Sequence, residues 1–202
     1  MTVSERLGKQ LAFIVEIDKL KRVVRQTLLM DASRCENDAE HSWHICVMAL
    51  LLSEYAADKV DVLRVVKMLL VHDLVEIDAG DTFCYDEKAA CDKEIREKQC
   101  ADRIFGLLPA DQAGELRMLW DEFEARVSPE AKFAAALDRL HPMLHNFNTH
   151  GAAWRKHGVT SDKVVARNRH IREGSAALWA YAEAMIKEAV AQGYLAEGRG
   201  EP

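Results

Sequence analysis

The sequence is poor in residues that interrupt regular secondary structure, because its 202 residues include only 10 glycines and 4 prolines. It also lacks any long stretch of alternating apolar and polar residues, which is the pattern of a half-buried strand. No apolar run approaches the roughly 20 residues that a membrane-spanning helix needs. Residues 1–10 lack the apolar core of a signal peptide. We therefore expect an all-α, cytoplasmic protein with no membrane partner.

Signs of disulfide bonding and of polyanion binding are absent as well. The five cysteines stand at positions 35, 46, 84, 91 and 100 and form no CxxC pair. An odd number of cysteines suits a reducing compartment. The net charge of −6 argues against a surface for nucleic acid polymers. It still permits a small phosphorylated ligand, which needs only local arginines and a metal ion.

Apolar residues recur at helical spacing along almost the whole chain. Asn37 and Glu40 have the spacing of a capping box, and Ser128 followed by Pro129 is typical of a helix start. Gly80 suits the end of a helix. The expected helices follow a stripe from Leu7 to Leu20 and then cover residues 37–55, 61–80, 87–105, the stretches that begin at 109 and 128, and 161–192 with an interruption at Gly174.

The chain shows no internal repeat, no linker and no low-complexity tract. We therefore expect a single domain over residues 1–202. Its core would cover about residues 7–170, and a C-terminal helical extension would cover about residues 161–192.

A histidine and an aspartate stand side by side in the helix expected over residues 61–80. The segment from Met68 to Val75 is apolar apart from His72 and Asp73, so both side chains are expected to be buried. Their burial costs on the order of several kcal/mol unless a partner compensates it. Taken alone, the dipeptide favours a hydrogen-bonded pair between helices, whereas a metal ion would compensate both residues at once.

Two further segments favour the metal ion. His41 lies in the string E-N-x-A-E-H-S, His72 opens the string H-D-x-x-E-x-x-x-G-D, and Asp138 lies in A-x-D-R-L. This order of motifs resembles the HD-domain superfamily of metal-dependent phosphohydrolases, and within it the 5′-deoxynucleotidase branch, over about residues 7–170. The resemblance implies a helical bundle in which His41, His72, Asp73 and Asp138 hold one divalent metal ion. Two imidazoles and two carboxylates suit Mn, Fe, Co, Ni or Zn better than Mg.

Two acidic residues after the HD pair are candidates for the chemistry itself. Glu76 lies four residues after His72 and three after Asp73, hence on the same helical face. A carboxylate beside the metal can carry protons to or from the reacting groups. Asp81 follows Gly80, and the resemblance places the matching Gly-Asp against the substrate. Without the HD context, a surface glutamate and an ordinary loop aspartate would be the simpler interpretations.

Arginines are needed to bind a phosphate group besides the metal. Arg25 and Arg34 match arginines near the pocket of the resembling nucleotidases, although solvated surface arginines remain an equal alternative. Those relatives carry a tryptophan at or just after the first arginine, where it packs on the sugar. Here Gln26, Thr27 and Leu28 follow Arg25, so strict selectivity for 2′-deoxy sugars is not expected.

Three further histidines lie close to the motif residues in the sequence. His44 is one helical turn from His41, and His141 and His145 are one and two turns after Asp138. A second metal ion would need such ligands. Histidines on helix faces are more often packed or hydrogen-bonded, so the sequence favours a single ion.

The motifs together predict a metal-dependent phosphomonoesterase, an HD-type 5′-nucleotidase that hydrolyses nucleoside 5′-monophosphates to nucleoside and phosphate. Nucleoside triphosphates or cyclic nucleotides are alternative substrates, and a nucleotide-binding protein without turnover is an alternative function. Glu76 and Asp81 favour the enzyme, since a sensor would not need a proton carrier. The partner would be a small phosphorylated metabolite, and both a monomer and a homodimer stay open.

Overall fold

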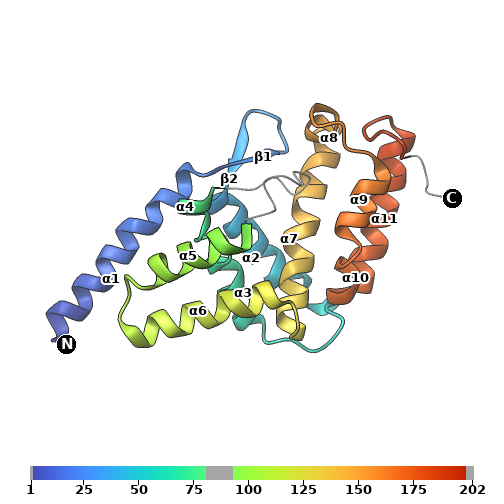
Figure 1. Cartoon of the computed structure of the whole chain (residues 1–202). Helices are drawn as coiled ribbons and strands as arrows, with labels where there is room; N and C mark the ends of the chain where they lie inside the picture. Colours follow the sequence, from blue (N-terminus) through green and yellow to red (C-terminus); the bar gives the residue numbers. More distant parts are fainter. Residues whose placement is uncertain (1, 81–92, 199–202) are drawn as a thin grey trace.

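The computed structural model describes residues 2–80 and 93–198. The described part is mostly helical, with one small sheet, which confirms the all-α prediction (Figure 1). No helix in the described ranges is both long and apolar enough to cross a membrane. The elements are α1 (Val3–Ile17), η1 (Asp18–Arg22), β1 (Val24–Leu28), β2 (Cys35–Asn37), α2 (Asp38–Leu52), η2 (Ser53–Tyr55), α3 (Val62–Val71), α4 (Glu76–Ala79), α5 (Lys93–Phe105), α6 (Ala110–Ala125), α7 (Pro129–Asn148), α8 (Ala152–Lys156), α9 (Ser161–Asn168), α10 (Ile171–Gly174) and α11 (Ala176–Ala191).

Helix α7 is the centre of the bundle. Figure 1 shows α2 and α3 on one side of it and α9 to α11 on the other. More than half of its residues are buried, including the run Ala134–Ala136. These small side chains let α10 approach closely: a Cβ added at Gly174 would overlap the carbonyl oxygen of Lys132 on α7. The central helix can therefore present buried polar side chains to α2 and α3.

The local signals at helix ends are confirmed. Asn37 caps α2, its side chain accepts a hydrogen bond from the Glu40 amide, and Glu40 accepts one from the Asn37 amide. Ser128 caps α7 directly before Pro129. Gly80 ends α4 with a φ of 75°, in the left-handed region where glycine is favoured.

The expectation that the chain has no strand was wrong for residues 24–37. There β1 and β2 form an antiparallel hairpin that pairs Val24 with Asn37 and Leu28 with Cys35. The connecting turn is fixed by the Asp31 carboxylate, which accepts hydrogen bonds from the amide and hydroxyl of Ser33. Two strands of five and three residues are too short to show the alternation that predicts a strand.

The single helix expected over residues 61–80 was also wrong, because α3 ends at Val71 and α4 begins at Glu76. In between, the amides of Leu74 and Glu76 bond to carbonyls three residues back instead of four. The Leu69 carbonyl, which would accept the Asp73 amide in a continuous α-helix, contacts His72 Nδ1 at 2.9 Å. The HD pair therefore lies in a tight turn rather than in a helix.

Two other expected helices differ from the structure. The helix from Asn37 ends as an α-helix at Leu52 and continues as the 3-10 turn η2 to Tyr55. The helix expected over residues 161–192 is divided into α9, α10 and α11, with the predicted interruption at Gly174 and another after Asn168. The beginning of the helix expected over residues 87–105 lies outside the described residues, and the described part is α5.

Candidate metal centre

Two of the predicted ligands meet between the start of α2 and the middle of α7. His41 lies in the first turn of α2 and is fully buried, while Asp138 of α7 is 6% exposed. His41 Nε2 is 3.1 Å from Asp138 Oδ1. The capping box at Asn37 and Glu40 fixes where α2 begins, and so it places the His41 side chain against α7.

The other two ligands enter from the turn between α3 and α4. His72 Nε2 is 3.0 Å from Asp73 Oδ1 and 3.8 Å from Asp138 Oδ1, and Asp73 Oδ2 is 3.9 Å from His41 Nε2. All four side chains are buried. The structure thus brings together the predicted set His41, His72, Asp73 and Asp138, which we call the HD cluster.

The chemistry of the HD cluster fits a cation at its centre. Because His72 Nδ1 donates its proton to the Leu69 carbonyl, the neutral ring presents a lone pair at Nε2. That nitrogen is buried without a hydrogen bond among the described residues, although a carboxylate oxygen of Asp73 lies 3.0 Å away. A lone pair and a carboxylate oxygen at this distance repel each other unless a cation lies between them.

The pKa values of His72 and Asp138 also indicate that positive charge is stabilised in the HD cluster. Burial alone would lower the pKa of His72, but the carboxylates of Asp73 and Asp138 outweigh it and raise that pKa to about 9. Burial opposes ionisation of Asp138, but Arg139 and the two imidazoles hold the pKa of Asp138 well below its usual range. Without a metal ion, a proton on His72 therefore takes its place. Metal binding and proton release are coupled at such sites.

Further carboxylates lie next to the HD cluster. Oxygens of Asp38, Asp73 and Glu76 come within 4.8 Å of one another, and all three side chains are buried. Arg25 of β1 joins them, because its Nη1 is 2.9 Å from Asp38 Oδ1 and 3.0 Å from Asp73 Oδ2. Burial, with a further contribution from Asp73, raises the pKa of Asp38 to about 7. Glu76 and Arg25 thus lie beside the HD cluster, as the sequence predicted.

Asp38 is a site residue that sequence reasoning missed. It stands at the first position of α2, where acidic residues are common because they face the positive end of the helix dipole. Its side chain is completely buried and contacts Arg25, which comes from the unpredicted hairpin.

Arg34, another predicted site residue, does not lie at the HD cluster. Arg34 forms an ion pair with Glu40 at 2.8 Å and bonds to the Cys35 carbonyl, and its side chain is 53% exposed. It therefore contacts the capping box rather than the HD cluster. Asp81 lies outside the described residues.

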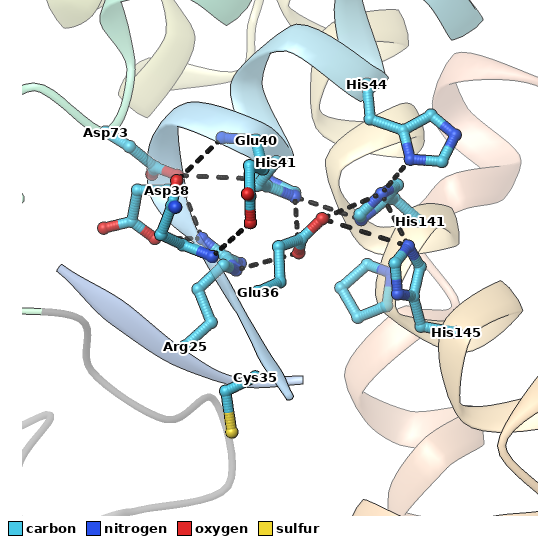
Figure 2. A network of polar contacts seen from close by, with 12 residues as sticks. Arg25, Cys35, Glu36, Asp38, Glu40, His41, His44, Asp73, His141 and His145 are labelled. Atoms are coloured by element: carbon cyan, nitrogen blue, oxygen red, sulfur yellow. Dashed lines mark hydrogen bonds and ion pairs between the residues drawn. The ribbon is translucent and has the colours of Figure 1, made fainter. Parts of the chain in front are cut away.

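A second group of buried polar side chains lies on the other face of His41. Glu36, His44, His141 and His145 each offer a ligand atom within 4.8 Å of the others, and we call this group the histidine cluster. Figure 2 shows Glu36 between Arg25 on one side and His141 and His145 on the other. His41 joins the two clusters, because its Nδ1 is 3.0 Å from His141 Nδ1. The sequence pointed to the three histidines, but it gave no reason to add Glu36.

Comparison with known proteins decides the family. The family model described as "HD domain" matches residues 17–179, which is most of the chain. The chain belongs to the HD domain family. The resemblance that the motifs predicted is therefore confirmed.

Curated members of the family give more detail. The chain is 34% identical to the human "5′-deoxynucleotidase HDDC2" over 135 residues, which cover 66% of this chain and 65% of that protein. It is 32% identical to the Danio rerio protein of the same name over 139 residues, 68% of each chain. The chain thus spans about two thirds of the length of the curated relatives that it matches.

Solved structures agree with the fold. A crystal structure described as a "predicted metal-dependent phosphohydrolase" from Magnetospirillum magnetotacticum MS-1 is 60% identical, with a TM-score of 0.91, and covers 95% of this chain and 96% of that one. An HD-domain phosphohydrolase from Listeria innocua, 17% identical with a TM-score of 0.64, covers 91% of this chain and 90% of its own and shares the fold.

Proposed function

We propose that this HD-domain protein is a metal-dependent phosphomonoesterase that hydrolyses nucleoside 5′-monophosphates, ribo or deoxyribo, to nucleoside and phosphate. The observation that supports the proposal is that the two imidazoles and two carboxylates of the HD cluster lie close together, beside Arg25 of the hairpin. The curated relatives named 5′-deoxynucleotidases support the substrate class.

In this proposal His41, His72, Asp73 and Asp138 hold one divalent ion. Two nitrogens and two anionic oxygens favour Mn, Fe, Co, Ni or Zn over Mg. When bound, the ion supplies charge for a phosphate oxygen and lowers the pKa of a water molecule. The burial of all four ligands keeps this charge in a low-dielectric environment, where it acts more strongly than in water.

The neighbouring side chains supply proton transfer and orientation. Glu76 forms a buried group with Asp38 and Asp73, in which burial and the charge of Asp73 raise the pKa of Asp38 to about 7, so the group can hold a proton near neutral pH. Glu76 would pass that proton to the leaving nucleoside oxygen. Arg25, which is 12% exposed, would turn one of its N–H groups from Asp38 or Asp73 to the phosphate.

The proposed site also includes Arg34 and Asp81. The ion pair of Arg34 with Glu40 would have to open before the guanidinium could bind a phosphate. For Asp81 the support is the Gly-Asp motif of the resembling enzymes.

Turnover with a reconstituted protein tests the proposal. The chain is stripped with a chelator, reloaded with Mn, Co or Zn, and assayed for phosphate release from nucleoside mono-, di- and triphosphates and cyclic nucleotides. We expect monophosphates to be hydrolysed best and His72→Ala to be inactive. Hydrolysis of triphosphates alone, or of cyclic nucleotides alone, would show that the substrate is not a nucleoside monophosphate. Nucleotide binding without turnover under any metal would make the protein a sensor.

A further inference from the structure

The histidine cluster collects ligand atoms from three elements of the fold. Glu36 lies on β2, His44 on α2, and His141 and His145 on α7. His141 Nε2 is 3.0 Å from His44 Nδ1, 3.0 Å from His145 Nε2 and 3.5 Å from Glu36 Oε1. None of these residues belongs to the HD cluster.

Protons alone satisfy this arrangement poorly. His145 Nδ1 is 2.7 Å from the Leu28 carbonyl and donates its proton there, which leaves a lone pair on Nε2. That lone pair faces His141 Nε2, which also faces His44. One proton on His141 Nε2 can be donated well to only one of its neighbours, and His141 is fully buried, so water does not reach it.

The ionisation states also suit a cation. Burial lowers the pKa of His44 and His145, and a neutral imidazole is the form that binds metals. The Glu36 carboxyl group is buried as well, and its Oε2 lies 3.8 Å from Arg25 Nε. A divalent ion would stabilise the Glu36 carboxylate and satisfy the lone pairs of all three rings.

We propose that Glu36, His44, His141 and His145 form a second metal site, one that takes a zinc-like transition-metal ion. Four ligands of a tetrahedral zinc ion at ~2.1 Å lie about 3.4 Å from one another. Between His141 or His145 and its neighbours in the cluster, the separations run from 3.0 to 3.9 Å. Three nitrogens and one oxygen suit Zn, Co, Ni or Cu.

The ion would have a structural role. It would tie β2 to α2 and α7, while the bond from His145 to Leu28 ties β1 to the same point. The hairpin carries Arg25, whose guanidinium lies against Asp38 and Asp73. An ion in the histidine cluster would therefore fix the position of that arginine without touching the substrate.

The metal content of the full chain tests the second site independently of turnover. The stripped protein is titrated with Co(II) or Zn(II), and the bound metal is counted by elemental analysis after gel filtration. We expect two ions per chain in the wild type, and one in each of His44→Gln and His145→Gln, with affinity for the second ion weakened more than about 100-fold. His157→Gln changes an exposed histidine and should keep both ions. The absorption of Co(II) reports whether the second ion is four-coordinate.

His44 is half-buried at the edge of the cluster, so His44→Gln is expected to fold, and circular dichroism checks this. A wild-type chain that takes up a single ion, lost on His72→Ala and unaffected by His44→Gln, would overturn the proposal. Two ions that persist in both histidine variants would overturn it as well, because the second would then bind elsewhere.

Discussion

The HD cluster and the histidine cluster lie on opposite faces of His41 and use the same kinds of ligand in different proportions. The HD cluster pairs two imidazoles with two carboxylates, and the carboxylates of Asp38 and Glu76 lie beside it. The histidine cluster has three imidazoles and a single carboxylate. The additional carboxylates beside the HD cluster can carry protons, whereas four protein ligands around one ion, as proposed for the histidine cluster, make a closed site of the structural kind.

Arg25 lies between the two clusters and contacts both. Its Nη1 is within hydrogen-bonding distance of Asp38 and Asp73, and its Nε is 3.8 Å from Glu36. The HD cluster therefore combines additional carboxylates beside it with the guanidinium nitrogen of Arg25 that can turn toward a phosphate. From this difference we propose catalysis for the HD cluster and structural support for the histidine cluster.

The largest expected effect separates the clusters directly. His72→Ala removes a proposed ligand of the catalytic ion, so kcat/KM should fall by about 10³-fold or more, since such an ion supplies several kcal/mol of transition-state stabilisation. His145→Gln should leave kcat/KM within about tenfold, because His145 touches neither substrate nor the HD cluster. Both are measured as phosphate release under saturating metal. Equal losses in the two variants would break the division between the clusters.

The next effect tests the carboxylates beside the HD cluster. Glu76→Gln should keep the metal and the substrate affinity but lower kcat by roughly 10²–10⁴-fold, the loss expected for a proton carrier. Metal content and ligand binding are measured together with kcat. Asp38→Asn serves as the comparison, because Asp38 shares the same carboxylate group. A larger fall in kcat for Asp38→Asn would transfer the proton role to Asp38.

The two arginines should differ more modestly. Arg25→Gln removes a charge-assisted hydrogen bond to phosphate and should lower kcat/KM by about 10–100-fold. Arg34→Gln removes an exposed, solvent-screened ion pair with Glu40, so the midpoint of thermal unfolding should change little and turnover should stay within about threefold. Steady-state kinetics and thermal unfolding measure both effects. A larger loss of kcat/KM in Arg34→Gln than in Arg25→Gln would mean that the phosphate binds at Arg34.

The smallest effect concerns the sugar. The resemblance implies a tryptophan at or just after Arg25, where this chain has Gln26, Thr27 and Leu28. Trp43 is 65% exposed on α2, and Trp154 is buried on α8. With no indole expected against the sugar, an added 2′-hydroxyl should be rejected by about 10²-fold or less. The kcat/KM values for AMP and dAMP under one metal give the ratio. A preference near 10⁴ for dAMP would mean that another side chain fills the space.

The part of the site that the sequence predicted depends on local signals. The capping box of Asn37 and Glu40 needs only a spacing of three residues, and it places His41 in the first turn of α2. Ser128 and Pro129 start α7, and Asp138 follows within the same helix. With the HD pair, these signals were enough to predict the helical fold and the HD family, and both were confirmed.

The part that the sequence did not predict depends on contacts between distant segments. The hairpin forms because β1 pairs with β2, and neither strand is long enough to be recognised alone. In the sequence, Asp38 resembles an ordinary acidic residue at a helix start. Only the structure shows that it accepts a hydrogen bond from Arg25. The apolar pattern around His72 is continuous in the sequence, but the helix is interrupted there. The Leu69 carbonyl accepts a hydrogen bond from the His72 ring in place of a backbone amide of the helix. Glu36 became a candidate ligand only when β2 placed it beside His141 and His145.

The short contact between His41 and His141 has a thermodynamic consequence for the two clusters. Their Nδ1 atoms are 3.0 Å apart, so a single proton lies between them. If His41 Nε2 holds an ion, Nδ1 carries that proton and donates it to His141, whose own proton then occupies Nε2. An ion in the histidine cluster must expel that second proton before His141 can ligate it. Each of the two proposed ions would thus weaken the binding of the other by the same factor, since linkage between two binding equilibria is reciprocal.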